Sequence, residues 1–474
     1  MNFYFEAANV LDRLDARQGS IKGLLSTLPD KDRKRTAALV IETLKYKPVL
    51  LDVISTSALL KTERKITSQS LALVLVHDVL LSSGIQAGDG PVKQAILRHK
   101  TRLNGEFQKL KIKRGAKSNA ELASTGDARA ERIPRYVRVN TLKWTTEEAV
   151  ETFTSRGFKL GDPLQANTFA RDEHIPDLLL FPPQTSFHGD PAYDSGKIIL
   201  QDKASCFPAT VLAPPANERS VVLDATAAPG NKTSHLCALM GNQGKLMAFE
   251  RDRRRFGTLK TMLAKAGCAN TEPLNIDFLT TDPADAKFSQ VTHILLDPSC
   301  SGSGIVNRLD YLLETEEEND DSHEERLNKL ASFQLMMIRH AMKFPSVQKI
   351  VYSTCSIHAT ENEHVVLSAL KSPEAAAGPF VLAPRTQVLP TWPRRGAPGV
   401  LASDSDTQAV VRCSPGEDAT NGFFVSCFVR RMPTSVGTKR KDRSETTDDD
   451  PAPKTNKRKK KKKKSAMSKE PTSV

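Results

Sequence analysis

Between residues 201 and 431, short apolar segments recur and are separated by stretches with helical patterning. This order is typical of a parallel sheet flanked by helices. We therefore expect an α/β, Rossmann-like domain over residues 201–432, which would bind its ligand at the carboxyl ends of the strands. The expected strands are Val221–Asp224, Lys245–Glu250, His293–Asp297, Ile350–Ser353 and Phe423–Phe428.

The first 120 residues follow a different pattern, because their apolar residues recur at helical spacing. Arg33–Val53 carries apolar residues three and four positions apart, which predicts one helix with a buried face. Ser68–Leu81 is apolar almost throughout and predicts a buried helix. Lys111–Arg132 is polar and basic, which indicates a linker or an exposed loop. We expect a helical N-terminal domain over residues 1–120.

A small α+β unit is expected over residues 133–200. Arg135–Asn140 alternates like a half-buried strand. Thr145 and Glu148 have the spacing of a helix capping box, and Gly157 stands where that helix would end. We interpret this unit as an RRM-like module that binds RNA, and Arg135, Arg138 and Lys143 are candidates for a basic patch. A solvated charged face is the simpler interpretation of each of these residues.

Charge and cysteine spacing restrict the class of protein. The net charge is +13, and residues 433–474 alone hold 14 Lys and Arg against 6 Asp and Glu. We expect a disordered basic tail there, which suits a nucleic-acid partner. The seven cysteines lie far apart, so neither a disulfide framework nor a metal site is expected. No signal peptide and no membrane-spanning segment is expected, which indicates a soluble intracellular protein.

The segment from Val221 to Gly241 reads as strand, tight loop and helix. Its small residues let a ligand approach the backbone at the end of the strand. Glu250 ends the next strand, where a carboxylate can accept hydrogen bonds from both ribose hydroxyls of a nucleoside. The loop lacks the Gly-x-Gly-x-x-Gly pattern, which favours a nucleoside without a pyrophosphate, such as S-adenosylmethionine. A turn that holds no ligand is the alternative.

Two cysteines follow expected strands, Cys300 in Asp-Pro-Ser-Cys and Cys355 in Ser-Thr-Cys-Ser. A single buried thiol is more often a core residue than a nucleophile. Two thiols at strand ends beside a nucleoside loop suit methylation of cytosine at carbon 5. That reaction needs a thiolate to add to carbon 6, and later needs the carbon-5 proton to be removed so that the thiolate can leave.

These segments resemble the Nol/Nop/Sun family of RNA cytosine-5 methyltransferases. The matching motifs run in the family's order over roughly residues 135 to 430. They are Val137–Leu142, Leu200–Cys206, Thr226–Thr233, Asp297–Gly304, Ser353–Ser356 with Glu361–Glu363, and Asn421–Phe424.

The resemblance implies a class I S-adenosylmethionine-dependent methyltransferase domain with Cys355 as nucleophile and Cys300 assisting product release. Asp297 would lie between the methyl donor and the base, and Lys203 would reach the target base. The implied cofactor residues are Thr226, Ala227, Ala228, Pro229, Gly230, Asn231, Lys232, Glu250, Arg255, Asp277 and Asp297.

Two positions depart from the family pattern: Thr226 replaces a common Cys, and Ser299 replaces the Pro before the first cysteine. The second variant resembles the subgroup that acts on large-subunit (25S/28S) ribosomal RNA. That resemblance implies a role in ribosome biogenesis, with rRNA and pre-ribosomal particles as partners. The basic run Lys457–Lys464 resembles a nuclear or nucleolar localisation signal. The alternative is a tail that only aids solubility. A tRNA cytosine-5 methyltransferase and a non-catalytic ribosome-assembly factor are the alternatives.

Overall fold

The computed structural model of the chain describes residues 1–29, 31–307, 309–313 and 320–431. The expected basic tail over residues 433–474 lies outside these ranges. Within them, no helix combines the length and the apolar character that crossing a membrane requires.

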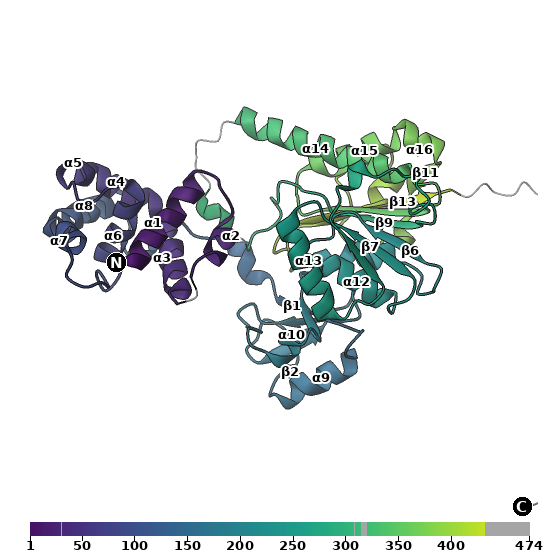
Figure 1. Cartoon of the computed structure of the whole chain (residues 1–474), viewed down its shortest axis with the longest axis horizontal. Helices are drawn as coiled ribbons and strands as arrows, with labels where there is room; N and C mark the ends of the chain where they lie inside the picture. Colours follow the sequence, from purple (N-terminus) through teal and green to yellow (C-terminus); the bar gives the residue numbers. More distant parts are fainter. Residues whose placement is uncertain (30, 308, 314–319, 432–474) are drawn as a thin grey trace, which may run out of the picture. The chain divides into compact units, whose positions relative to one another are not determined.

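The N-terminal region is helical, as its spacing predicts (Figure 1). The buried helix expected near Ser68–Leu81 is confirmed as α6, and the Ser68 hydroxyl caps it by accepting from the Leu71 N–H at 3.1 Å. The helices are α1 Asn2–Asp15, α2 Ile21–Ser26, α3 Arg33–Lys45, α4 Lys47–Thr56, α5 Leu59–Thr62, α6 Gln69–Leu81, α7 Pro91–Arg98 and α8 Lys100–Lys113.

Two expectations for this region are wrong in part. The stretch Arg33–Val53 forms two helices with a break at Tyr46, where α3 ends and α4 begins. Pro48 lies in the first turn of α4, and a proline without an N–H suits a helix start better than a helix interior. The expected linker at Lys111–Arg132 begins inside α8 and later forms two short 3-10 turns, η1 Ala120–Leu122 and η2 Ala128–Arg132.

The α+β unit is a mixed sheet in the order β2-β3-β4-β1-β5, in which β1 pairs antiparallel with β4 and β5. The expected capping box is confirmed, since the Thr145 and Glu148 side chains each bond the other's backbone N–H. The elements are β1 Arg135–Val139, α9 Thr146–Ser155, β2 Lys159–Leu160, β3 Thr168–Arg171, β4 Leu178–Phe181, α10 Pro191–Asp194 and β5 Ile198–Leu200.

The larger sheet has the order β11-β13-β10-β9-β6-β7-β8, and β12 pairs with β13. Its strands are β6 Val221–Asp224, β7 Lys245–Phe249, β8 Thr271–Leu274, β9 His293–Leu296, β10 Lys349–Thr354, β11 Phe380–Leu382, β12 Val411–Cys413 and β13 Phe423–Arg430. The helices are α11 Lys203–Leu212, α12 Asn231–Leu239, α13 Arg253–Ala266, α14 Asp320–Met342, α15 Glu363–Leu370, α16 Pro373–Ala377 and α17 Asp404–Ala409. The short 3-10 turns are η3 Phe278–Thr280, η4 Leu309–Leu313, η5 Ala359–Glu361 and η6 Arg385–Gln387.

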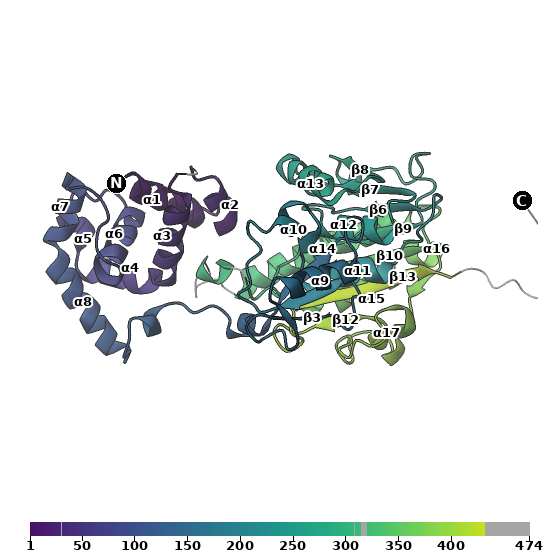
Figure 2. The same cartoon turned by 90° about the horizontal axis from the view of Figure 1, so that it is seen from below.

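Helices cover both faces of this sheet (Figures 1 and 2). Successive strand residues face opposite sides, so Leu223 and Ile294 pack with side chains of α14 and α15. Val222 and Leu295 pack with side chains of α11 and α12 on the other face. The α/β, Rossmann-like expectation is confirmed, and the five expected strands are present with ends shifted by at most two residues.

Candidate active site

The strand order places a ligand site at the ends of β6 and β9. These two strands are parallel neighbours, although β7 and β8 lie between them in the chain. The chain runs outward from β6 through β7 to β8 on one side, and from β9 to β10 on the other. Open sheets bind ligands at the carboxyl ends of strands where the order reverses in this way. The residues at the carboxyl ends of β6, β7, β9 and β10 are Asp224, Glu250, Asp297 and Cys355, respectively.

The loop from β6 to α12 is held in one conformation by its own side chains. The Thr233 hydroxyl donates to Asp224 Oδ2 at 2.8 Å. Gly230 has a φ of +115°, and a Cβ there would lie 3.3 Å from Leu259 Cδ1. A side chain at Gly230 would therefore be strained and crowded. Burial, only partly offset by hydrogen bonds from Thr233 and the Thr226 N–H, raises the pKa of Asp224 to about 6.

The acidic residue expected to face a ribose is well placed for that task. Glu250 is buried, and its Oε1 accepts the Asp252 N–H at 2.8 Å. Its Oε2 lies 3.5 Å from Arg255 Nη1, while Arg255 Nη2 donates to the Ala228 carbonyl at 2.7 Å. Oε2 therefore keeps acceptor capacity for a hydroxyl group. The structure joins Arg255, Glu250 and the loop, and this donor and acceptor set fits a nucleoside.

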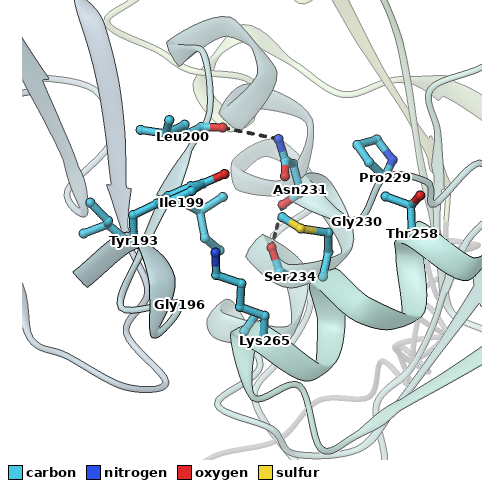
Figure 3. Close-up of a pocket in the computed structure, with 13 residues that line it drawn as sticks. Tyr193, Gly196, Ile199, Leu200, Pro229, Gly230, Asn231, Ser234, Thr258 and Lys265 are labelled. Carbon is cyan, nitrogen blue, oxygen red and sulfur yellow. Dashed lines mark hydrogen bonds between the residues drawn. The ribbon is translucent and has the colours of Figure 1, made fainter. Parts of the chain in front are cut away.

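Asp277 lies after β8, the strand next to β7. Its Oδ1 accepts the Leu279 N–H at 3.0 Å, and its Oδ2 lies 3.5 Å from Arg251 Nη1. Its contact with a cofactor stays a prediction. Asn231 faces the smaller sheet, because its Nδ2 donates to the Leu200 carbonyl at 3.4 Å (Figure 3).

Asp297 connects β10 to the loop between β6 and α12. This loop is called the cofactor loop below, after the role predicted for it. Its N–H donates to Thr226 Oγ1 at 2.9 Å, and its Oδ1 accepts from Ser353 Oγ at 2.8 Å. Its Oδ2 pairs with Lys232 Nζ at 2.8 Å, and Lys232 also donates to Ser205 Oγ at 3.0 Å. Burial lowers the pKa of Lys232, but the charges of Asp297 and Cys355 outweigh burial, so the net direction is upward. Lys232 is therefore an ammonium ion that pairs with Asp297 and lies within electrostatic range of Cys355.

The two cysteines come together. Cys300 Sγ lies 3.1 Å from Cys355 Sγ, and both residues are half-buried. The Gly304 N–H also donates to the Cys355 carbonyl at 2.9 Å, which joins the two loops. Contact with Cys355, burial and the charges of Asp297 and Glu361 together raise the pKa of Cys300. The raised pKa favours Cys300 as the protonated member of the pair, although the geometry of the contact allows either sulfur to donate.

The Lys203 side chain interacts with residues of the small α+β unit. Its ammonium pairs with Asp172 Oδ2 at 2.7 Å, contacts His174 Nδ1 at 3.1 Å and lies 5.3 Å from the centre of the Trp392 ring. Only 7% of its side chain is exposed. Its contact with the target base stays a prediction.

Arg138 does not belong to an exposed patch, which corrects the expectation for the basic residues of the small unit. Its side chain is fully buried, with Nε donating to Gln201 Oε1 at 2.8 Å and Nη2 to Ser234 Oγ at 2.8 Å. It stands on the inward face of β1 and links that strand to α12. Arg135 and Lys143 are exposed, as expected.

A cavity of about 220 Å³ lies beside the cofactor loop (Figure 3). Pro229 and Gly230 contribute to its wall, together with residues of β5 and α13. Neither Glu250 nor Asp297 lines it. The cavity is therefore not lined by the two carboxylates that the sequence assigns to the cofactor.

The contacts that Lys232, Glu361 and Gln334 make in the structure were not predicted from the sequence. Lys232 was expected only among the cofactor residues, because its pairing with Asp297 depends on the order of the strands. Glu361 was recognised as part of a motif without a function. Gln334 lies inside α14, and an isolated polar residue in a helix carries no signal that would have identified it.

Comparison with known proteins places this geometry in context. Residues 209–429 match the family model described as 16S rRNA methyltransferase RsmB/F. Residues 34–123 and 133–201 match the N-terminal domain and the ferredoxin-like domain of NOL1/NOP2/Sun domain family member 5.

Two relatives are similar over most of their length. The chain is 44% identical to the 25S rRNA (cytosine-C(5))-methyltransferase rcm1 of Schizosaccharomyces pombe, over 90% of this chain and 91% of the relative. It is 44% identical to the 28S rRNA (cytosine-C(5))-methyltransferase of Mus musculus, over 91% of each. The crystal structure of PH0851 shares the fold, with a TM-score of 0.59, 22% identity, and coverage of 85% of this chain and 91% of that one.

Proposed function

Because the chain belongs to the NOL1/NOP2/Sun family of RNA cytosine-C5 methyltransferases, we propose that it methylates carbon 5 of a cytosine in large-subunit ribosomal RNA. The observation that carries this proposal is the contact between Cys300 Sγ and Cys355 Sγ, 3.1 Å apart. This contact lies where Asp297 and the cofactor loop also meet. Both full-length relatives named above act on the large-subunit RNA.

Cys355 is the nucleophile of the proposed reaction. Its sulfur forms a bond to carbon 6 of the cytosine, and the electron pair of the 5,6 double bond then makes carbon 5 nucleophilic. Lys232 supplies positive charge beside this thiolate. After methyl transfer, a base removes the carbon-5 proton, the double bond re-forms and the carbon–sulfur bond breaks.

Cys300 assists this last step. Its raised pKa keeps it a thiol, so its S–H is available to the departing Cys355 thiolate across 3.1 Å. A hydrogen bond to the leaving sulfur stabilises the charge that develops there. Asp297 borders both partners of the reaction, and its carboxylate can accept a hydrogen bond from the amino group of the cytosine.

S-adenosylmethionine would supply the methyl group. Residues 226–232 would hold it at the end of β6, and Glu250 would bind its ribose hydroxyls. Arg255 fixes Glu250 and the loop relative to each other through its two contacts. Asp277 would contact the same nucleoside from the end of β8.

The target cytosine must be unpaired or extruded, because carbon 6 is inaccessible inside a duplex. We propose that the α+β unit over residues 133–200 and the helical region over residues 1–120 bind the surrounding RNA. The basic tail over residues 433–474 suits a nuclear, and specifically nucleolar, location, where rRNA and pre-ribosomal particles would be the partners.

The test is methyl transfer from labelled S-adenosylmethionine to purified RNA. Large-subunit rRNA and tRNA from cells that lack the protein are compared as acceptors. We expect label in cytosine of the large-subunit rRNA with the wild-type chain and none with Cys355→Ala. Label in tRNA alone would assign the activity to that substrate. Cofactor binding without any label in RNA would assign the chain to ribosome assembly.

A further inference from the structure

Two adjacent residues, Glu361 at the end of η5 and Asn362 just before α15, contact the two cysteine loops separately. Both side chains are fully buried. Glu361 faces the loop that carries Cys300, and Asn362 faces the loop that carries Cys355. These contacts involve residues on both sides of each cysteine.

Glu361 and its partner Gln334 hold the Cys300 loop. Glu361 Oε1 accepts the Ser301 N–H at 2.9 Å, and its Oε2 accepts the Ser301 hydroxyl at 2.6 Å. Gln334 Nε2 donates to Glu361 Oε1 at 3.0 Å and to the Ser299 carbonyl at 3.0 Å. Residues 299 and 301 are thus both anchored by buried groups, which leaves little freedom for Cys300 between them.

Tyr352 fixes the orientation of this arrangement. Its hydroxyl lies 3.0 Å from Gln334 Oε1 and is also within hydrogen-bond distance of the Glu361 carbonyl. Burial raises the pKa of Tyr352, so it remains a donor. Tyr352 lies on β10, three residues before Cys355, which ties the Cys300 loop to the strand that positions the nucleophile.

Asn362 holds the Cys355 loop in a similar way. Its Oδ1 accepts the Thr354 hydroxyl at 2.6 Å, and its Nδ2 donates to the Ser356 carbonyl at 2.9 Å. Residues 354 and 356 flank Cys355. The amide therefore holds the Thr354 side chain on one side of the nucleophile and the Ser356 backbone on the other.

We propose that Glu361 and Asn362 are positioning residues that set the separation of the two thiols, Glu361 for product release and Asn362 for attack. This inference rests on the proposed function and deepens it. Glu361 holds Ser301, and Asn362 holds Thr354 and Ser356, so each acts on its cysteine through the neighbouring residues of the loop. Displacing a reacting group by about 1 Å can cost about 10²-fold in rate, so small shifts in these loops are consequential.

The alternative is that this network only stabilises the fold. The two explanations differ in which step of the reaction fails. A purely structural role would lower the fraction of folded protein and reduce attack and release together. The positioning role predicts that Glu361→Gln slows release while attack persists, and that Asn362→Ala slows attack.

The experiment uses the full chain, large-subunit rRNA from cells that lack the protein, and S-adenosylmethionine. Protein–RNA adduct that survives denaturing electrophoresis reports attack without release, and 5-methylcytosine in free RNA reports release. Thermal unfolding and binding of S-adenosylhomocysteine report folding. The control is Glu417→Gln, because Glu417 is an exposed acid paired with Arg394. Cys300→Ala and Cys355→Ala are the reference variants.

We expect Glu361→Gln and Ser301→Ala to slow release by roughly tenfold to a hundredfold and to accumulate adduct, as Cys300→Ala does. Asn362→Ala should slow adduct formation by a similar factor without accumulation. Ser301→Ala decides the case if Glu361→Gln fails to fold. It removes the hydroxyl that contacts Glu361, Ser303 and Ser356, but leaves the buried carboxylate and its bond from the residue-301 N–H in place.

Release at the wild-type rate in folded Glu361→Gln or Ser301→Ala would overturn the assignment of Glu361. Attack at the wild-type rate in Asn362→Ala would overturn the assignment of Asn362. If Cys300→Ala itself formed no adduct, the proposed division of labour between the cysteines would fail, whatever the other variants showed.

Discussion

Cys300 and Cys355 are 55 positions apart in the chain, yet their sulfur atoms lie 3.1 Å from each other. They follow β9 and β10, which are parallel neighbours, so both thiols emerge at the same edge of the sheet. A thiol at this distance can share a proton with the other sulfur. The relationship therefore suits two different tasks.

Cys300→Ala is expected to trap the enzyme on its substrate. Without the Cys300 S–H, the departing thiolate of Cys355 loses its hydrogen-bond donor, so the carbon–sulfur bond breaks slowly. A protein–RNA band should persist in denaturing gels and should disappear in the double variant with Cys355→Ala. Normal turnover by Cys300→Ala would show that release does not need this thiol.

Glu250→Gln should weaken cofactor binding. The variant keeps the shape but loses the charge that strengthens hydrogen bonds to the ribose, and such bonds contribute about 1.5–3 kcal/mol each. The dissociation constant of S-adenosylhomocysteine, measured by calorimetry, should rise roughly tenfold to a hundredfold.

The matched control for this measurement is Glu272→Gln on β8, whose carboxylate pairs with Lys245 and Lys287. The affinity of Glu272→Gln for S-adenosylhomocysteine should equal that of the wild type. Equal affinities for all three proteins would place the ribose away from Glu250.

Gly304→Ala should disrupt the junction of the cysteine loops. A Cβ at Gly304 would lie 2.3 Å from the Gly422 carbonyl oxygen, which is backbone and cannot swing aside. Overpacking of this kind costs about 1–3 kcal/mol in the free energy of unfolding, and activity should fall with it.

Gly105→Ala serves as its control, because nothing lies within 4 Å of that added atom in α8. Alanine in a helix interior should stabilise the protein by about 0.5–1 kcal/mol. Urea unfolding measures both variants, and equal stability of Gly304→Ala and the wild type would contradict the packing described.

The stability of the fold should depend on pH through Asp224. Its pKa of about 6 in the folded state lies above the usual value of an unfolded Asp, near 3.9. The native state therefore binds more protons between these values. The contribution of Asp224 to the free energy of unfolding is greatest below about pH 4. It declines by roughly 3 kcal/mol in total as pH rises through about 6.

Asp224→Asn removes this titration. Urea titrations at a series of pH values measure the free energy of unfolding of the wild type and the variant. As pH rises, the wild type should lose stability relative to the variant. A difference that does not change with pH would contradict the shifted pKa.

Five of the eight strands of the larger sheet could be predicted because each is a short apolar run, whereas β8, β11 and β12 were not predicted. The two cysteines and Glu250 were also identifiable, since strand ends in such sheets carry functional groups. The break at Tyr46 was missed because the apolar spacing continues across it, although Pro48 carries the local signal.

Pairings across the sheet were not predictable from the chain alone. The contact between Lys232 and Asp297, and the approach of Cys300 to Cys355, both depend on β9 lying between β6 and β10. Arg138 was misjudged because a charged residue in an alternating strand normally faces solvent. Here a glutamine, a serine and a backbone carbonyl accept from its Nε and Nη2, while Nη1 is buried without a hydrogen-bond partner among the described residues.

Bisulfite sequencing of large-subunit rRNA tests the central claim most directly. RNA is compared from cells that contain the wild-type chain, cells that lack it and cells that contain only Cys355→Ala. The proposed function predicts a cytosine that resists conversion in the first sample and is converted in the other two. Identical conversion at every large-subunit cytosine in all three samples would contradict it.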